Sequence, residues 1–460
     1  MQSLTIRFAP GGGPLYRQLY AALRAEIAAQ RLSAGEKLPG KRRLAADLGV
    51  SVNTVDAAYG MLAAEGYVEA HARSGFVVCR LDSLPAPAAP VPAPAEAPPA
   101  PFLYDCATAS IDTTLFPYKT WRRIQQDVLA RAPEFLNHGH RQGDEELREA
   151  VATHLREYRA VRCGAHQVVI GAGIEYLLGM LARLLCRETF AVEDPGYART
   201  ARILHNNGVR AAFIPVDRRG MDTAALAASG ARVAYVTPSH QFPTGVTMPV
   251  QRRYELLRWA EDGRFLIEDD YDSEFRFDTR PLPSLQGMDG AGRVIYIGTF
   301  SKSVAPAIRI AYMVLPETLL GRWRDEFGFY SCTVSRFEQQ TLARFLQGGH
   351  FARHLGRLRV AYRGRRDALA AALRAQLPGV RLDGLHTGLH LLATVPCGLS
   401  PAQMERAAAD NGVRCNALAD YYAAGAPENA PPAMVLGYAG LPEAAIPGAA
   451  AALRRAWLGD

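Results

Sequence analysis

The first 80 residues combine the apolar spacing of short amphipathic helices with two β-like runs. Apolar residues recur at every fourth position of the first predicted helix, at Leu15, Leu19, Leu23 and Ile27. A second, short helix is predicted over KRRLAADLGV and ends at Gly49 as a C-cap. A third follows Ser51, and its inner face is predicted to carry Val55, Ala58, Tyr59 and Leu62. The runs YVEAHA and GFVVCR then predict a hairpin, so this segment is expected to form a winged helix-turn-helix.

From residue 166 onward, short β-rich runs alternate with helical stretches. The seven strand candidates are QVVIGAG, TFAVEDPGY, RAAFIPVD, ARVAYVTPS, RFLIEDDYD, RVIYIGTFS and RIAYMVLP. These runs do not alternate between apolar and polar residues, which favours strands buried on both faces of a mostly parallel, seven-stranded sheet. The pattern therefore predicts an α/β fold, whose ligand chemistry would gather at the carboxyl ends of the strands.

A proline-rich stretch separates these two parts. Residues 85–101 read PAPAAPVPAPAEAPPAP, with eight prolines in 17 positions. Such a stretch cannot pack a core and is expected to run as an extended spacer. The sequence thus predicts a DNA-binding domain at 1–80, a Pro/Ala-rich linker at 81–101 and a large domain at 102–460.

Composition narrows the class of protein. Hydrophobic residues make up 49% and charged residues 21%, which is globular composition. No run approaches the ~18 to 20 apolar residues of a membrane span, and the N-terminus lacks the pattern of a signal peptide. The seven cysteines contain no CxxC pair, which argues against a disulfide framework and against a structural zinc site, so no metal is expected. A reducing, cytoplasmic compartment fits best.

Lysine is rare in this chain. The 52 Lys and Arg residues include only four lysines, at positions 37, 41, 119 and 302. Arginine can replace lysine on a surface but not where chemistry needs a deprotonatable amine. A lysine retained in so arginine-rich a chain therefore indicates a chemical role that arginine cannot fill, although codon drift would leave the same pattern. Lys119 lies in a segment whose neighbouring residues suggest no chemical role, so it is expected to lie on the surface.

Lys302 has a chemical context. It follows a predicted strand in TFSKSVAPAIRI, among the hydroxyls of Thr299 and Ser301 and seven residues before Arg309. An aldehyde cofactor that carries a phosphate needs such a set, because the amine forms a Schiff base while hydroxyls and a guanidinium bind the phosphate. Asp269 ends the strand FLIEDD and could pair with a pyridinium nitrogen.

The N-terminal segment resembles the GntR-type winged-helix family over about 65 residues, through LPGKRRLAADLGVS, NTVDAAYGMLAAEGYVE and the wing SGFVV. The resemblance implies contacts to double-stranded DNA from Arg42, Ser51, Asn53, Thr54, Arg73, Ser74 and Gly75. The family often has arginine where this chain has Val52 and a basic residue where it has Asp56. The alternative to a DNA-binding domain is a small helical interaction domain whose basic residues form an ordinary solvated face.

The region from about 102 to 460 resembles a fold-type I pyridoxal-phosphate enzyme of the aspartate aminotransferase class, through EDPGY, TPSHQFPTG, IEDDYDSEFRF and GTFSKSVAPAIRIAYMVLP. The whole chain resembles the MocR subfamily of GntR-type regulators. The resemblance implies a large part at about 102–315 and a smaller α+β subdomain at about 316–460. It also implies pyridoxal 5'-phosphate as cofactor, with Lys302 as its covalent attachment. The other implied cofactor contacts are Asp269, Tyr271, Tyr197, Gly171, Ala172, Gly173, Thr299, Ser301 and Arg309.

Two departures from the aminotransferase pattern bear on function. The arginine that would grip a substrate carboxylate is replaced by Val435, and His138 stands where a partner subunit's tyrosine usually reaches the phosphate. His138 could equally be an ordinary loop histidine. Arg199 and Arg414 could take over carboxylate binding as an effector site, or each could be a plain structural arginine.

Three hypotheses follow. The first is a homodimeric transcription regulator that binds an operator and senses pyridoxal phosphate or an amino compound that reacts with it. The second is a working aminotransferase with an accessory DNA-binding domain. The third is a pyridoxal-phosphate storage or scaffold protein. The altered arginine position favours the regulator, with transaminase chemistry at most residual.

Overall fold

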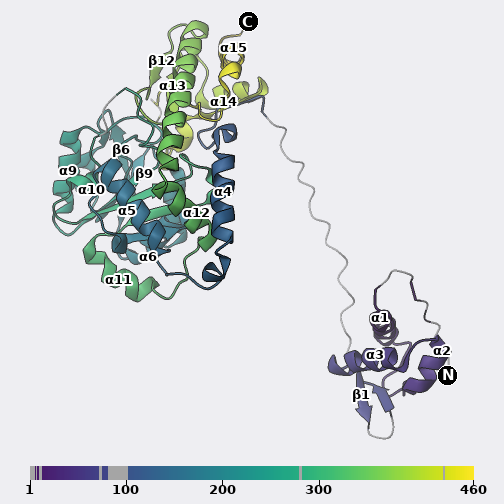
Figure 1. The fold of residues 1–460 in the computed structure, drawn as a ribbon. Helices are drawn as coiled ribbons and strands as arrows, with labels where there is room; N and C mark the ends of the chain where they lie inside the picture. Colours follow the sequence, from purple (N-terminus) through teal and green to yellow (C-terminus); the bar gives the residue numbers. More distant parts are fainter. Residues whose placement is uncertain are drawn as a thin grey trace. The chain divides into compact units, whose positions relative to one another are not determined.

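The computed structural model describes residues 6, 8–9, 13–71, 75–80, 102–278, 282–427 and 430–459. The chain divides into two compact units, Met1–Pro99 and Ala100–Asp460 (Figure 1). The predicted linker at 81–101 lies outside the described residues, so the predicted domain limits remain a prediction.

The N-terminal unit contains the predicted three helices and hairpin. Its elements are α1 (Leu15–Ala28), α2 (Lys41–Leu48), α3 (Val52–Ala64), β1 (Val68–His71) and β2 (Gly75–Val78), the two strands pairing antiparallel. All four apolar residues predicted for the inner face of α3 are buried, and Gly49 caps α2 with a φ of 64°. In α1 the predicted stripe is buried except for Leu15, which is 44% exposed because it is the first residue of the helix.

Within the described residues of the second unit, eight strands form one sheet in the order β4-β11-β10-β9-β8-β5-β6-β7. The strands are β4 (Val168–Gly171), β5 (Phe190–Asp194), β6 (Ala211–Asp217), β7 (Gly220–Met221), β8 (Val233–Val236), β9 (Phe265–Asp270), β10 (Val294–Thr299) and β11 (Ala311–Val314). All seven predicted strands are present. The two-residue β7 was not predicted, since it is too short to have a pattern. The strands from β6 through β10 pair parallel, while β11 is antiparallel to both neighbours.

Helices cover both faces of this sheet, as the uniformly apolar strands require. Neighbouring residues of β4 show it: Val169 packs in the cluster of α6 and α11, whereas Val168 and Ile170 pack in the cluster of α5 and α12. The helices of this part are α4 (Tyr118–Leu129), α5 (Glu145–Arg159), α6 (Ile174–Leu184), α7 (Ala198–Asn206), α8 (Thr223–Ala228), α9 (Val250–Ala260), α10 (Leu285–Met288), α11 (Glu317–Phe327) and α12 (Arg336–Gln347).

A smaller α+β part follows along the long helix α13 (His350–Gln376), which contacts both α12 and α15 (Figure 1). Its four-stranded antiparallel sheet has the order β12-β13-β16-β15, and β14 pairs parallel with β3. The elements are β3 (Tyr104–Asp105), β12 (Arg381–Asp383), β13 (His390–Thr394), β14 (Val413–Arg414), β15 (Asn416–Ala417), β16 (Ala433–Gly437), α14 (Pro401–Asp410) and α15 (Ile446–Leu458).

Six short 3-10 turns are found among the described residues: η1 (Thr113–Leu115), η2 (Ala132–Phe135), η3 (Ala165–Gln167), η4 (Pro306–Ile308), η5 (Leu418–Tyr421) and η6 (Glu443–Ala445). None of the helices in the described part of the chain has the length and apolarity needed to cross a membrane.

Candidate functional site

A cavity of about 380 Å³ opens at the carboxyl ends of the parallel strands in the second unit. The structure brings eight of the residues predicted from sequence to its wall: Tyr197, Arg199, Asp269, Tyr271, Thr299, Ser301, Lys302 and Arg309. They follow β5, β9 and β10 along the chain, so the fold collects them at one edge of the sheet.

Lys302 lies three residues beyond the end of β10, and its ammonium donates to the carbonyl oxygen of Thr108. Burial lowers the pKa of Lys302 to about 8, against the opposing charge of Asp272. A lysine with this pKa has a neutral, nucleophilic fraction near neutral pH, which a surface lysine lacks. Lys119, in contrast, is exposed on α4 as expected.

Asp269, near the end of β9, is a buried residue of the cavity wall. Burial, followed by the charges of nearby carboxylates, raises its pKa to about 7, while a hydrogen bond from Tyr235 opposes the rise. The Tyr235 hydroxyl donates to Oδ2, but Oδ1 has no hydrogen-bond partner among the described residues. An orphaned buried acceptor costs free energy unless a donor arrives, and a ring N–H⁺ would supply one. The residues present therefore fit a pyridinium cofactor.

A second group of residues suits a phosphate. Ser301 donates its backbone N–H to Thr299 Oγ1, so the two hydroxyls lie together at the end of β10. Arg309 Nη2 donates to the carbonyl oxygen of Ala172 at 3.2 Å. Gly173 begins α6 with a φ of +102°, and a Cβ there would lie 2.3 Å from Arg309 Nη2. Glycine is thus required for the guanidinium to approach the start of the helix. Gly171, Ala172 and Gly173 do not line the cavity wall themselves.

Glu175, in the first turn of α6, was missed by the sequence reasoning. Its Oε2 lies 3.1 Å from Arg309 Nη2, and its Oε1 lies 3.0 Å from Arg199 Nη1. The Tyr197 hydroxyl donates to Oε1 at 3.3 Å. One carboxylate thus joins the predicted phosphate arginine to a predicted effector arginine. Nothing in the local letters GIEYLL signals this, because both arginines come from distant segments.

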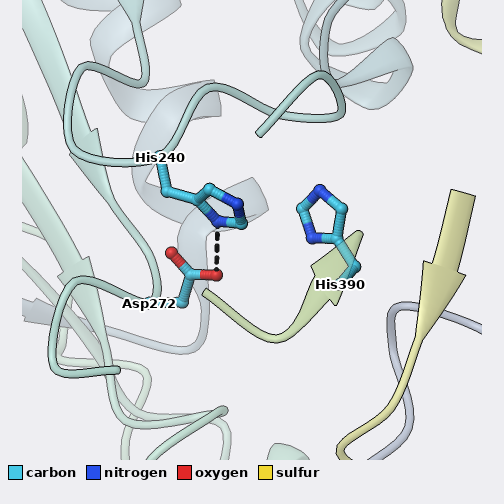
Figure 2. A group of neighbouring side chains, drawn as sticks. All are labelled: His240, Asp272 and His390. Carbon is cyan, nitrogen blue, oxygen red and sulfur yellow. Dashed lines mark hydrogen bonds and ion pairs between the residues drawn. The ribbon is translucent and has the colours of Figure 1, made fainter. Parts of the chain in front are cut away.

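Three further buried side chains lie together beside the cavity, from the ends of β8 and β9 and the start of β13 (Figure 2). His240 Nδ1 lies 2.9 Å from Asp272 Oδ2 and 3.0 Å from the Tyr271 hydroxyl oxygen. The rings of His240 and His390 are 4.6 Å apart between centroids, and His390 Nε2 lies 3.0 Å from the carbonyl oxygen of Pro243. Burial, then the neighbouring His240, lowers the pKa of His390 well below its usual value.

This arrangement can orient Tyr271. The Tyr271 hydroxyl donates to the backbone carbonyl oxygen of His240 at 3.1 Å, and its oxygen also lies 3.0 Å from His240 Nδ1. An Nδ1–H of His240 would donate to Asp272 and face the Tyr271 oxygen, so His240 fixes the position of the phenol at the cavity. The residue types would also suit a metal: His240 Nδ1 and His390 Nε2 already have these partners, whereas the buried His240 Nε2 has none among the described residues. Sequence reasoning could have marked His240 and Asp272 from their strand-end positions. His390 carries no such signal, because it comes from the smaller part of the unit.

The remaining predicted residues lie elsewhere. Arg414 is on β14, with Nη1 3.9 Å from Asp105 Oδ2, and it does not line the cavity. His138 is exposed. Val435 is buried on β16 in an apolar cluster with Leu392 and Leu418. Val435 is therefore part of a buried apolar cluster and does not line the cavity.

Four of the predicted DNA-contacting residues lie around the starts of α2 and α3: Arg42, Ser51, Asn53 and Thr54. Arg42 and Asn53 are exposed. Ser51 is the N-cap of α3, where its Oγ accepts the backbone N–H of Thr54 at 3.1 Å. Gly75 opens β2 with a φ of +98°, whereas Arg73 and Ser74 lie outside the described residues. Lys41 forms an ion pair with Asp56, so the acidic departure from the family pattern is partly neutralised.

Comparison with known proteins supports both halves of this description. Residues 15–78 match the family of bacterial regulatory proteins, gntR family. YdeL, an uncharacterized HTH-type transcriptional regulator of Bacillus subtilis, is 38% identical over 96% of this chain and 97% of its own length. The probable rhizopine catabolism regulatory protein MocR of Rhizobium meliloti is 35% identical over 93% of this chain and 90% of its own.

The second unit is similar to solved aminotransferases. LysN, an alpha-aminoadipate aminotransferase of Thermus thermophilus complexed with N-(5'-phosphopyridoxyl)-L-leucine, is 28% identical, with a TM-score of 0.68 over 77% of this chain and 92% of that one. Fold and site together define a winged-helix transcription regulator joined to an aminotransferase-like domain. The chain belongs to the MocR subfamily of GntR-type regulators.

Proposed function

We propose that this regulator binds pyridoxal 5'-phosphate in its aminotransferase-like domain and that the cofactor, or an amino compound reacting with it, controls its binding to an operator. The observation that carries the proposal is the convergence of a low-pKa lysine, a buried carboxylate with an orphaned oxygen and an arginine at a helix start around one cavity. The similar LysN structure holds a phosphopyridoxyl compound in the same fold.

Each residue has a distinct part in this proposal. Bound pyridoxal phosphate supplies an aldehyde and an electron-accepting ring. Lys302 is the covalent attachment, and Asp269 fixes the charge of the ring nitrogen. Tyr271, which contacts His240, would be placed to hydrogen-bond the phenolic oxygen, and Tyr197 would lie against the ring. Three groups neutralise the phosphate: the hydroxyls of Thr299 and Ser301, the Arg309 guanidinium, and the backbone of 171–173.

Covalent attachment can be tested directly. The purified protein is expected to be yellow, and borohydride is expected to fix the chromophore to a peptide that contains Lys302. Lys302→Arg keeps the positive charge but removes the deprotonatable amine, so the adduct should disappear. Lys119→Arg, on exposed α4, is the matched control and should retain it. An adduct that persists in the Lys302 variant would contradict the assignment.

The effector can be identified by operator affinity measured for apo-protein, for cofactor-bound protein and for cofactor-bound protein with each candidate amine. Val435 stands where the aminotransferase pattern has a carboxylate-binding arginine, and it lies in a buried apolar cluster that offers no contact for an amino-acid carboxylate. We therefore propose that pyridoxal phosphate itself is the effector. A change of about tenfold, or about 1.4 kcal/mol, on cofactor addition alone would support this. A response only to added amines would instead favour an amine effector and a carboxylate contact at Arg199, since Arg414 lies away from the cavity.

We further propose a cytoplasmic homodimer that presents two winged helices to DNA. Its operator would then contain two half-sites separated by a fixed helical phase. Inserting five base pairs between the half-sites should place them on opposite faces of the duplex and abolish tight binding, whereas inserting ten should restore much of it. Insensitivity to both insertions, or a monomer that holds the cofactor tightly, would contradict the dimer.

A working aminotransferase is the second candidate, favoured by the retained Lys302 and Asp269. Turnover decides between the two. A regulator should bind one promoter fragment tightly and yield little keto acid across a panel of amino donors. Rapid turnover with weak, sequence-independent DNA binding would reverse the ranking.

A further inference from the structure

The start of α6 already holds an anion, and that anion belongs to the chain. The Glu175 carboxylate accepts hydrogen bonds from Arg309 at 3.1 Å, from Arg199 at 3.0 Å and from Tyr197 at 3.3 Å. Its own backbone N–H, in the first turn of the helix, also favours the ionised carboxylate and lowers its pKa. Two guanidiniums, a hydroxyl and a helix-start amide form the donor set that binds phosphates.

The charge state of Glu175 follows from these donors. Burial alone would raise its pKa, but the backbone amide and the two arginines together lower it. The carboxylate is therefore ionised at neutral pH, and it competes as a full negative charge. A neutral glutamine in its place would keep the shape of the side chain but lose that charge.

The same contacts suggest how the carboxylate would move. Oε1 faces Arg199 and Tyr197, whereas Oε2 faces Arg309. A phosphate bound to Arg309 would repel only Oε2, the oxygen that contacts this guanidinium. The partly exposed Glu175 side chain could keep its contact with Arg199 through Oε1. A Cβ at Gly173 would lie 2.3 Å from Arg309 Nη2 and 3.2 Å from Glu175 Oε2, so the guanidinium and the carboxylate both pack against this glycine. Arg309 Nη2 is therefore the donor that a phosphate at the start of α6 would have to share with Oε2.

We propose that Glu175 is an internal competitor of the cofactor phosphate: it occupies Arg309 in the empty protein and lowers affinity for the phosphorylated cofactor specifically. The inference rests on the proposed function, since it requires pyridoxal phosphate in this cavity. Its consequence is regulatory. A site that must exchange its own anion for the ligand's has a higher Kd, so its occupancy changes with cofactor concentration over a higher range.

The test compares pyridoxal phosphate with pyridoxal, which lacks the phosphate, on apo-protein. Glu175→Gln is expected to tighten the Kd for pyridoxal phosphate by about tenfold, because it removes a charged competitor from Arg309. The Kd for pyridoxal should change by less than about twofold, because that ligand has no phosphate to compete. Melting temperature verifies folding, and Glu175→Ala serves as a second variant should the glutamine variant fail to fold.

Glu255→Gln is the matched control. Glu255 also joins two arginines, Arg219 at 2.8 Å and Arg252 at 3.0 Å, but it lies outside the cavity. Its substitution should leave both affinities unchanged. A double-mutant cycle adds a second readout, because the gain from Glu175→Gln should vanish when Arg309→Ala is also present.

The outcomes separate the two claims. If the wild-type protein binds pyridoxal phosphate but Glu175→Gln leaves that Kd unchanged or weakens it, the competitor role is wrong and the proposed function stands. An equal gain for pyridoxal and pyridoxal phosphate would also overturn the competitor role, since the phosphate would then not be involved. If the wild-type protein forms no adduct at Lys302 with either aldehyde, the proposed function itself fails.

Discussion

The starts of α3 and α6 are both expected to meet phosphate groups, yet they are built differently. At α3 the neutral hydroxyl of Ser51 caps the helix, and the first turn contains no acidic residue. At α6 the N-cap is Gly173, which has no side chain to offer, and Glu175 stands in the first turn. The acid nearest to the start of α3, Asp56, is instead held by Lys41.

This difference matches the phosphate ligand proposed for each helix N-terminus, DNA at α3 and the cofactor at α6. DNA presents phosphates at high density, and a helix end kept free of negative charge can meet them without rearrangement. A free cofactor is scarce by comparison, and a helix end that carries its own carboxylate exchanges one anion for another. We infer that α3 is a standing contact surface and that α6 is a site whose occupancy can change.

The largest expected contrast is in pH dependence, where the cavity that contains the α6 start should respond through Lys302 and Asp269, and the α3 start should not. The pKa of Lys302 is lowered to about 8, so its amine is protonated below that pH and free above it. The neutral fraction at pH 6 is about fiftyfold smaller than at pH 8. Asp269, with a pKa raised to about 7, also loses its charge toward pH 6. Cofactor attachment should therefore accelerate as the pH rises from 6 to 8.

Stopped-flow absorbance on apo-protein at constant ionic strength measures this rate. Pyridoxal, which lacks the titrating phosphate, should show the same trend as the phosphorylated cofactor. A rate that is flat across the range, or that rises toward acid, would show that the Lys302 amine does not limit attachment.

Removing the cation at α6 is expected to have the next largest effect. Charged hydrogen bonds contribute about 1.5–3 kcal/mol each, so Arg309→Ala should weaken pyridoxal phosphate binding by about 30-fold. Binding of pyridoxal should be nearly unchanged. Calorimetric titration of both ligands measures the difference. Equal losses for the two would indicate a general collapse of the cavity rather than loss of a phosphate contact.

Local structure was predictable from sequence to a high degree in both units. The inner face of α3 and all seven strands follow from apolar patterns that act over a few residues, as does the αL cap at Gly49. The position of Lys302 after a predicted strand likewise predicts a site at the strand ends, and Lys302 lines the cavity there. These features depend on periodicity and on turn chemistry, which a single segment contains.

What escaped prediction depends on contacts between distant segments. Glu175 lies in an ordinary apolar helix sequence, and its role arises only because Arg199 and Arg309 come within 3.1 Å of it. His390 reaches His240 from the other part of the unit. Arg414 was a candidate from its residue type alone, and β14 holds it away from the cavity. No local sequence pattern encodes these contacts between distant segments, or the absence of such a contact.

At the α3 side, Arg42→Ala should weaken binding to all DNA sequences by about tenfold at low salt and lower the salt slope by about one. The effect is smaller than at Arg309 because Arg42 would be one of many phosphate contacts along the DNA, whereas Arg309 would be the one cation proposed for the cofactor phosphate. Asn53→Ala should instead relax specificity, at about 1–3 kcal/mol for the preferred base. Titrations at several salt concentrations on operator and random DNA separate the two. If the variants behaved alike, the groove assignment would be wrong.

The hydroxyl cap distinguishes the two helix starts in stability. Ser51→Ala removes the acceptor for the Thr54 N–H and should cost about 1 kcal/mol. For a small unit this lowers the melting temperature by about 4–8 °C. Ser400→Ala is the matched control, because Ser400 caps α14 in the second unit in the same way. Each variant should shift only its own calorimetric transition, and a shared shift would mean that the units unfold together.

The smallest expected effect tests whether the α3 end is as free of negative charge as it could be. Asp56 is exposed and paired with Lys41, so Asp56→Asn should release that ammonium for DNA phosphates. Screening limits the gain to about threefold in affinity for random DNA at low salt, shrinking as salt is raised. Asp127→Asn, at an exposed position on α4 of the second unit, makes the same change in net charge and should have no effect. A loss of affinity in Asp56→Asn would instead mean that Asp56 positions Lys41 for its contact, and the acid at α3 would then support phosphate binding, the reverse of Glu175 at α6.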